Sequence, residues 1–221
     1  MAGIWLYIPA LNNGRGRENM LKLAIFGSGS GTNCQAIIDA VEEGTLKAEI
    51  RCVLADVEDA YILERARKHH IPAIYFDCAP FKTKLDGAAE KRVLAILKEH
   101  EVNFIALAGF MRIVKDGLLN AYKGRMINIH PSLLPSFPGL DGGKQAFEYG
   151  VKFTGCTVHY VDAGVDSGAI IHQKCVAIED DDTLDSLMQK IHEQEHIAYP
   201  EALRWIAEER LQLNGRRITL K

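Results

Sequence analysis

Apolar residues in the first 130 positions follow two different spacings. Short and almost unbroken apolar runs, typical of buried strands, alternate with stretches in which apolar residues recur every three or four positions, as in amphipathic helices. Strands that alternate with helices predict βαβ units in a doubly wound, mostly parallel, Rossmann-like sheet. The predicted strands are Leu21–Phe26, Ala48–Leu54, Ala73–Phe76, Phe104–Ala108 and Met126–His130, and the predicted helices cover Gln35–Val41 and residues 60–70, 86–100 and 114–122.

The pattern changes after Pro138. A short helix is expected over residues 143–149, followed by two long strands, Thr154–Val161 and Ala169–Ile178. Because only a short segment joins these strands, we expect them to pair antiparallel and to extend the sheet.

The end of the chain predicts one long helix and a hairpin. The helix is expected over residues 183–209, with Asp182 as its N-cap and a kink at Pro200. An Asn-Gly pair favours a tight turn, so residues 211–220 predict a hairpin that turns at Asn214–Gly215.

The composition is that of an ordinary globular protein. Of 221 residues, 48% are apolar and 25% are charged, and the formal net charge of −3 gives no general attraction to nucleic acid or to a membrane surface. No apolar run approaches the roughly 20 residues that cross a bilayer. We expect residues 20–221 to form a single domain, and residues 1–19 to be an extension of unknown role, with an added edge strand as one option.

The cysteines favour a cytoplasmic protein. They are odd in number, scattered and never in Cys-x-x-Cys spacing, a pattern that predicts buried, reduced thiols rather than disulfides or a zinc knuckle. The N-terminus has no basic start and no small-residue cleavage site, so a signal peptide is not expected. The cysteines are Cys34, Cys52, Cys78, Cys156 and Cys175.

A glycine-rich loop, Gly27–Asn33, joins the first strand to the first helix. Its backbone N–H groups, with the helix N-terminus behind them, suit a phosphate. The spacing departs from the Gly-x-Gly-x-x-Gly of dinucleotide folds, and Asp56 is only a weak candidate for the acidic residue that closes the second strand. The loop therefore favours a single phosphate over NAD as its ligand. The loop by itself leaves NAD as an alternative.

Asn128 and His130 are two residues apart at the end of a predicted strand and therefore project to the same side. An amide donor beside a side chain that exchanges protons near neutral pH suits acyl-type transfer. A buried structural histidine and a turn asparagine are the alternative interpretation.

A zinc-protease pattern, His192-Glu-Gln-Glu-His196, also occurs on the last helix. The pattern is short, and a metalloprotease needs a third ligand and a cleft beside this helix. No metal is expected.

Six motifs together resemble the phosphoribosylglycinamide formyltransferase family of folate-dependent enzymes. The resemblance runs from about Leu21 to Arg210, and the Asn-x-His-Pro-Ser-Leu-Leu-Pro motif marks the wider formyltransferase superfamily. The motifs are Ser28–Asn33, Leu107–Ile113, Asn128–Pro135, Gly155–Val161, Val165–Gly168 and Gln194–Pro200.

The resemblance implies transfer of a formyl group from 10-formyltetrahydrofolate, used as a co-substrate without metal or NAD, to the amine of N1-(5-phosphoribosyl)glycinamide in de novo purine biosynthesis. It implies small-molecule substrates, no nucleic-acid or membrane partner, and a monomer or homodimer. The implied catalytic residues are Asn128, His130 and Asp166, and the implied ribonucleotide contacts are Gly31, Thr32, Asn33, His192 and Glu195. The implied folate contacts are Lys84, Met111, Arg112, Ile113, Val114, Asn128, Asp162, Ala163, Gly164, Val165 and Asp166.

In the implied mechanism Asn128 and protonated His130 stabilise the oxyanion, and the charge of Asp166 keeps His130 protonated. The sequence departs from the family at two points. Lys84 stands where the family often has arginine. A histidine is expected shortly after Gly139, and Leu140-Asp-Gly-Gly-Lys144 has none, with Asp141 and Gly143 in that window.

The alternatives are another superfamily enzyme or a non-catalytic nucleotide-binding module. A formyl-folate hydrolase is expected to carry a further domain before Leu21. A methionyl-tRNA formyltransferase is expected to carry a C-terminal domain and a basic surface. A binding module has no need for Asn128, His130 and Asp166 together.

Overall fold

A computed structural model describes residues 20–221, and the expected extension of residues 1–19, with its possible edge strand, lies outside them. The strands are β1 (Leu21–Gly27), β2 (Ala48–Ala55), β3 (Ala73–Tyr75), β4 (Lys84–Leu85), β5 (Phe104–Leu107), β6 (Ile113–Val114), β7 (Met126–His130), β8 (Phe153–Tyr160), β9 (Ile170–Ala177), β10 (Leu211–Asn214) and β11 (Arg217–Leu220). The helices are α1 (Thr32–Glu42), α2 (Tyr61–Lys68), α3 (Gly87–Glu99), α4 (Asp116–Ala121), α5 (Gly142–Tyr149) and α6 (Leu184–Ala207).

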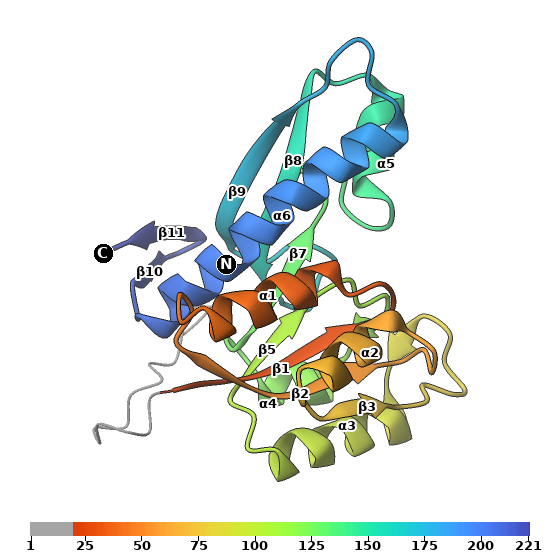
Figure 1. Cartoon of the computed structure of the whole chain (residues 1–221), viewed down its shortest axis with the longest axis vertical. Coiled ribbons are helices and arrows are strands. Elements are labelled where there is room, and N and C mark those ends of the chain that lie inside the picture. The colour runs from red at the N-terminus through yellow and green to blue at the C-terminus, as the bar shows by residue number, and fades with distance from the viewer. Residues whose placement is uncertain (1–19) are drawn as a thin grey trace.

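A seven-stranded sheet in the order β3-β2-β1-β5-β7-β8-β9 forms the centre of the molecule (Figure 1). The strands from β3 to β7 are parallel, and β8 and β9 continue the sheet in antiparallel pairing. The predicted fold class is therefore confirmed. The short strands β4 and β6, which pair with each other, were not predicted.

Helices cover both faces of the sheet. Side chains alternate between the faces along each strand, and both faces are apolar, so each needs a covering layer. In β1, Leu23 and Ile25 pack with the apolar residues of α1, α2 and α6, whereas Ala24 and Phe26 pack with α3 and α4. Figure 1 shows α1 and α6 side by side over the first of these faces. Complete burial of one such aliphatic side chain contributes about 1.5–3 kcal/mol, so both faces stabilise the sheet.

Strand β7 lies where the sheet changes from parallel to antiparallel. Asn128 is paired with Leu107 of β5 on one side and with His159 of β8 on the other. From α6, the buried Tyr199 hydroxyl donates to the carbonyl oxygens of Leu107 at 2.8 Å and Ile127 at 3.3 Å. The strand end that holds Asn128 is therefore fixed by both neighbouring strands and by a helix.

The expected N-cap of α6 was wrong by one residue. Thr183 is the N-cap, and it forms a capping box with Ser186. The Asp182 carboxylate is instead bonded to the Glu179 amide at 2.8 Å and to Lys190 Nζ at 2.7 Å. Because Lys190 holds the Asp182 carboxylate, Thr183 rather than Asp182 caps the helix. The helix continues through Pro200.

The hairpin turn and one cysteine also differ from expectation. Asn214 pairs with Arg217, so the turn residues are Gly215 and Arg216, one position later than predicted. Gly215 has φ +64°, a left-handed conformation that glycine adopts without strain. All the cysteines are free thiols and all but one are buried; the exception is Cys175 on β9, which is exposed.

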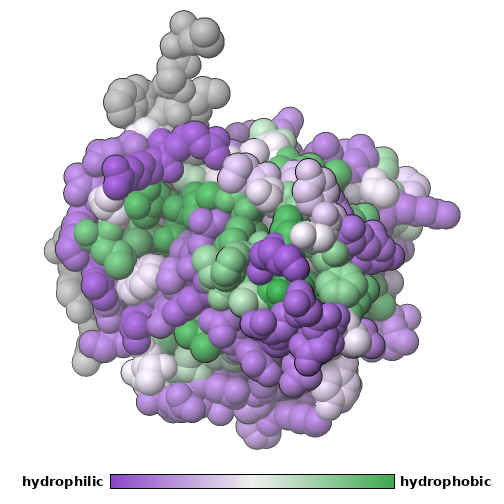
Figure 2. Space-filling model, turned by 90° about the horizontal axis from the view of Figure 1, so that it is seen from above, coloured by the Kyte–Doolittle hydropathy of each residue, from purple (hydrophilic) through white to green (hydrophobic). Residues whose placement is uncertain are grey.

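The exposed surface mixes apolar and polar residues. Seen from above, Figure 2 shows green apolar areas interrupted by purple hydrophilic ones. Leu140, Tyr149 and Phe153 are among the large apolar side chains that stay exposed. None of the helices within residues 20–221 has the length and apolar character that crossing a membrane requires.

Candidate active site

His130, the last residue of β7, is buried between two oxygen acceptors. Its Nδ1 lies 3.4 Å from Asp166 Oδ2, and its Nε2 lies 2.8 Å from the carbonyl oxygen of Phe137. Because both ring nitrogens face acceptors, both can carry a proton, and the ring can hold a positive charge. The backbone carbonyl of Phe137 was not anticipated from the sequence.

Asp166 reaches this ring from the loop between β8 and β9, as expected. Its Oδ2 accepts from the Gly139 amide at 2.8 Å, and its Oδ1 lies 3.6 Å from His159 Nε2. Burial favours the neutral acid, but the interactions with His159 and the Gly139 amide and the positive charge of His130 outweigh it. The pKa of Asp166 therefore lies below its ordinary value, and the residue is a carboxylate near neutral pH.

Asn128 has a neighbour that the sequence analysis did not assign. His159 lies directly across from it on β8, and the Asn128 Nδ2 atom is 3.3 Å from His159 Nε2. His159 Nδ1 lies 2.9 Å from the carbonyl oxygen of Tyr160. His159 Nε2 thus lies near both the Asn128 amide and Asp166 Oδ1, and because the Asn128 Nδ2 atom carries two N–H groups, one remains for a ligand. His159 lies inside the Gly155–Val161 motif, but its position opposite Asn128 depends on the register of β7 and β8.

Two glycines of the window in which a histidine was expected lie against the site. A Cβ added at Gly142 would lie 2.7 Å from His130 Nε2 and 2.9 Å from the carbonyl oxygen of Phe137. A Cβ at Gly143 would lie 2.6 Å from Met188 Sδ. Asp141 is exposed at the N-cap of α5, with φ +57°. Gly142, at the start of α5, therefore packs its backbone directly against the His130 ring.

The loop from Gly27 to Asn33 carries backbone N–H groups that have no acceptor among the described residues. Within residues 20–221, the N–H groups of residues 29–33 donate to none, and Gly31 has φ +71° at the N-cap of α1. N–H groups that converge at the start of a helix favour an anion. The loop lies at the carboxyl end of β1, at the same sheet edge as His130, because β1, β5 and β7 are parallel.

Glu195 of α6 approaches the same loop. Its Oε2 accepts from Asn33 Nδ2 at 2.8 Å, and Asn33 Oδ1 is buried without a partner among the described residues. Burial raises the pKa of Glu195 to about 7, although the Asn33 hydrogen bond opposes the rise. His192 lies one turn earlier on α6 and is exposed. The structure therefore brings Gly31, Thr32, Asn33 and Glu195 together, with His192 exposed beside them on the same helix.

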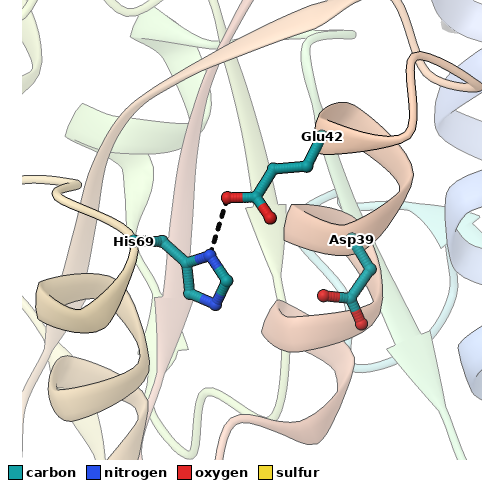
Figure 3. A group of neighbouring side chains, drawn as sticks. All are labelled: Asp39, Glu42 and His69. Carbon is teal, nitrogen blue, oxygen red and sulfur yellow. Dashed lines mark hydrogen bonds and ion pairs between the residues drawn. The ribbon is translucent and has the colours of Figure 1, made fainter.

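The zinc-protease pattern gathers no third ligand in the described part of the chain. The group there that could hold a cation is Asp39, Glu42 and His69, shown in Figure 3, and it contains neither His192 nor His196. His69 Nδ1 lies 2.7 Å from Glu42 Oε1, as the dashed line marks. Its other ring nitrogen lies 3.0 Å from Gln35 Nε2, so both nitrogens already have protein neighbours.

The expected folate wall is only partly open. The side chains of Met111 and Ile113 are 59% and 46% exposed, whereas Val114 is buried. Arg112 turns inward, where its Nε donates to Asp56 Oδ2 at 2.5 Å, and Asp56 Oδ1 accepts from the Ser28 hydroxyl at 2.6 Å. Asp56 and Arg112 thus join this wall to the glycine loop through protein contacts.

Lys84 lies beside this wall, because β4 pairs it with Ile113. Its Nζ is 2.6 Å from Asp86 Oδ2 and 4.1 Å from the centre of the Phe81 ring.

The loop expected to close over folate is shaped by Asp162. The Oδ1 atom of Asp162 accepts from the Gly164 amide at 3.1 Å and from the Ser167 hydroxyl at 2.5 Å. Ala163, Gly164 and Val165 are exposed at its tip.

An amide and an imidazole at the end of a central strand, with a carboxylate from the β8–β9 loop beside them, form the candidate active site of this Rossmann-like sheet. The formyl transferase family model matches residues 21–203, so the chain belongs to the formyl transferase family.

Its relatives narrow this class. The chain is 45% identical to the phosphoribosylglycinamide formyltransferase of Bacillus subtilis (strain 168) over 197 residues, 89% of this chain and 98% of that protein. It is 39% identical to the trifunctional purine biosynthetic protein adenosine-3 of Gallus gallus, covering 88% of this chain and 19% of that protein. The crystal structure of glycinamide ribonucleotide transformylase 1 from Symbiobacterium toebii aligns with a TM-score of 0.88 and 42% identity, covering 95% of this chain and 99% of that chain.

Proposed function

We propose that this chain transfers the formyl group of 10-formyltetrahydrofolate to the amine of N1-(5-phosphoribosyl)glycinamide, a step of de novo purine biosynthesis. The observation that carries the proposal is the His130–Asp166 pair at 3.4 Å, with Asn128 two residues before His130 on β7 and a loop of free N–H groups at the same sheet edge. A relative with this activity in its name covers nearly the whole chain.

The reaction forms one C–N bond and breaks another. The neutral amine attacks the formyl carbon, and the carbonyl oxygen gains negative charge. Asn128 Nδ2–H donates to that oxygen. The protonated ring of His130 stabilises it by charge, and donates to it through Nε2–H once that N–H leaves the carbonyl oxygen of Phe137. When the tetrahedral intermediate collapses, the bond to N10 of the folate breaks. N10 takes a proton from His130 or through water, and the attacking amine loses one. Asp166 holds the positive ring in place by charge and orientation.

The ribonucleotide phosphate binds at the free N–H groups of Gly31, Thr32 and Asn33. Glu195 orients the Asn33 amide, and its remaining acceptor sites face the ribose hydroxyl or amine groups; His192 extends this surface. These assignments rest on the Asn33–Glu195 contact and on the matching motifs.

The folate occupies the wall and the loop beside His130. The exposed side chains of Met111 and Ile113 contact the pterin, the buried Val114 completes this wall, and Asp162–Asp166 close over the ring. Since the Arg112 side chain is bound to Asp56, only its backbone is free to contact folate. Lys84 borders the folate site through its pairing with Ile113. The co-substrate is used without metal or NAD.

Residues 20–221 act as one formyltransferase domain with small-molecule substrates, without nucleic-acid or membrane partners, and in the cytoplasm. The family match to residues 21–203 and the single seven-stranded sheet support this part of the proposal.

The identity of the formyl acceptor distinguishes this proposal from a hydrolase and from a methionyl-tRNA formyltransferase. We expect the purified full chain to form formylglycinamide ribonucleotide from 10-formyltetrahydrofolate and to leave methionyl-tRNA unformylated when both acceptors are present. Formate released at the same rate with and without the ribonucleotide would indicate a hydrolase and would contradict the proposal. Preferential formylation of methionyl-tRNA would contradict it equally.

Gly142, which packs against the His130 ring, offers a separate test. Gly142→Ala is expected to lower kcat about a hundredfold, because its Cβ would displace His130 and a shift of about 1 Å in a catalytic group has an effect of that size. Gly143→Ala is the matched control, since its Cβ meets the flexible end of Met188. Steady-state kinetics of both variants check this, and a Gly142→Ala enzyme with unchanged kcat would disprove the packing argument.

A further inference from the structure

Helix α2 supports the glycine loop from behind. The Ile62 amide donates to the carbonyl oxygen of Gly29 at 3.1 Å, and Arg65 Nε donates to that of Ser30 at 2.8 Å. A Cβ added at Gly31 would lie 2.6 Å from Ile62 Cβ, so the helix packs directly against the loop backbone.

These two bonds also set the direction of the free N–H groups. In a trans peptide the C=O and the N–H point in opposite directions. The cis peptide bonds among residues 20–221 are Ala79–Pro80 and Leu134–Pro135, so the peptides of this loop are trans. With its carbonyl oxygen held by Arg65, the Ser30–Gly31 peptide aims the Gly31 N–H away from α2. The Ile62 bond does the same for the Ser30 N–H.

Arg65 also brings a charge that forms no ion pair among the described residues. No carboxylate oxygen of the described chain lies within 4.0 Å of its guanidinium, and Nη1 donates to the neutral Gln35 side chain at 3.2 Å. Arg65 and Thr32 line the same cavity of about 500 Å³ beside the loop, and Asp39 and Glu43 also line it. Arg67, two residues later, is exposed and paired with Glu64.

We propose that Arg65 is a positioning residue for the phosphate of the ribonucleotide. It fixes the peptide whose N–H faces the phosphate, and its unpaired positive charge lies behind that peptide. The inference rests on the proposed function, because it assigns the phosphate of that substrate to this loop.

The test is calorimetric binding of glycinamide ribonucleotide to the full chain without folate. Arg65→Met should weaken binding about tenfold, the effect of one charge-assisted hydrogen bond. Arg65→Lys, which keeps the charge but loses the planar guanidinium that bonds both Ser30 and Gln35, should recover part of the affinity. Arg67→Met is the matched control and should bind like the wild type. In turnover, Arg65→Met should raise KM for the ribonucleotide and leave kcat and KM for the folate within about twofold, a separation that general loosening of the fold does not produce.

Equal affinity of the wild type and Arg65→Met would overturn the inference, as would an equal loss in Arg67→Met. Inorganic phosphate, used as a competitor, should likewise bind more weakly to Arg65→Met. A wild type that binds the ribonucleotide through Arg65 but transfers no formyl group would refute the proposed function and leave this inference standing.

Discussion

Replacement of His130 by alanine is expected to lower kcat for formyl transfer about a thousandfold, with KM for the ribonucleotide changed much less. The variant loses a charged donor to the oxyanion, and such donors are worth about 10²–10³ in kcat. It also loses the proton source for the leaving nitrogen, which contributes about 10²-fold or more. The two effects overlap because one ring provides both. The phosphate loop lies elsewhere and is untouched.

The control for this variant is His172→Ala. His172 is also paired with a carboxylate, Glu201 at 2.9 Å, but it lies on β9 against α6 and Trp205. Its kcat should stay within about threefold of wild type, as expected for a residue with no contact to reacting groups. Circular dichroism establishes that both variants fold. A His130→Ala enzyme with more than a tenth of wild-type kcat would contradict the assignment.

Replacement of Glu195 by glutamine is expected to make stability less dependent on pH. Burial raises the pKa of Glu195 from its ordinary 4.5 to about 7. Below pH 4.5 the residue is protonated in the folded and unfolded chains alike. As pH rises towards 7, the unfolded chain releases the proton first, so stability present below pH 4.5 is lost by about pH 7. This pKa shift is equivalent to about 3 kcal/mol.

The measurement is the difference in Tm between Glu195→Gln and wild type at pH 5 and at pH 8. That difference should move in favour of the variant by about 5–10 °C from the lower to the higher pH, the shift that about 3 kcal/mol produces in a domain of this size. Glu193→Gln is the control, because Glu193 is exposed on the same helix. Parallel Tm curves for wild type and Glu195→Gln would contradict a raised pKa at this position.

The fold was largely predictable because apolar periodicity decides which face of each strand and helix is buried. The same alternation placed Asn128 and His130 on one side of β7, and the glycine loop lies at the same sheet edge. Asp166 was placed beside His130 only through the family resemblance, because a loop residue has no periodicity to locate it.

The remaining features depend on contacts between distant segments. His159 became a neighbour of Asn128 through strand register, which no local pattern specifies. Arg112 turned to a buried Asp56 rather than outward. Asp182 lost its expected capping role to Thr183 because Lys190, two turns further along, holds its carboxylate.

The central claim is that His130 and Asp166 act as one catalytic unit, and a double-mutant cycle in kcat tests it most directly. His130→Ala, Asp166→Asn and the double variant are compared with wild type under saturating substrates. Because Asp166 acts through the imidazole, the double variant should be no more than about threefold slower than His130→Ala, as residues of one unit are strongly non-additive. A double variant whose loss equals the product of the two single losses would show that the two residues act independently and would contradict the account.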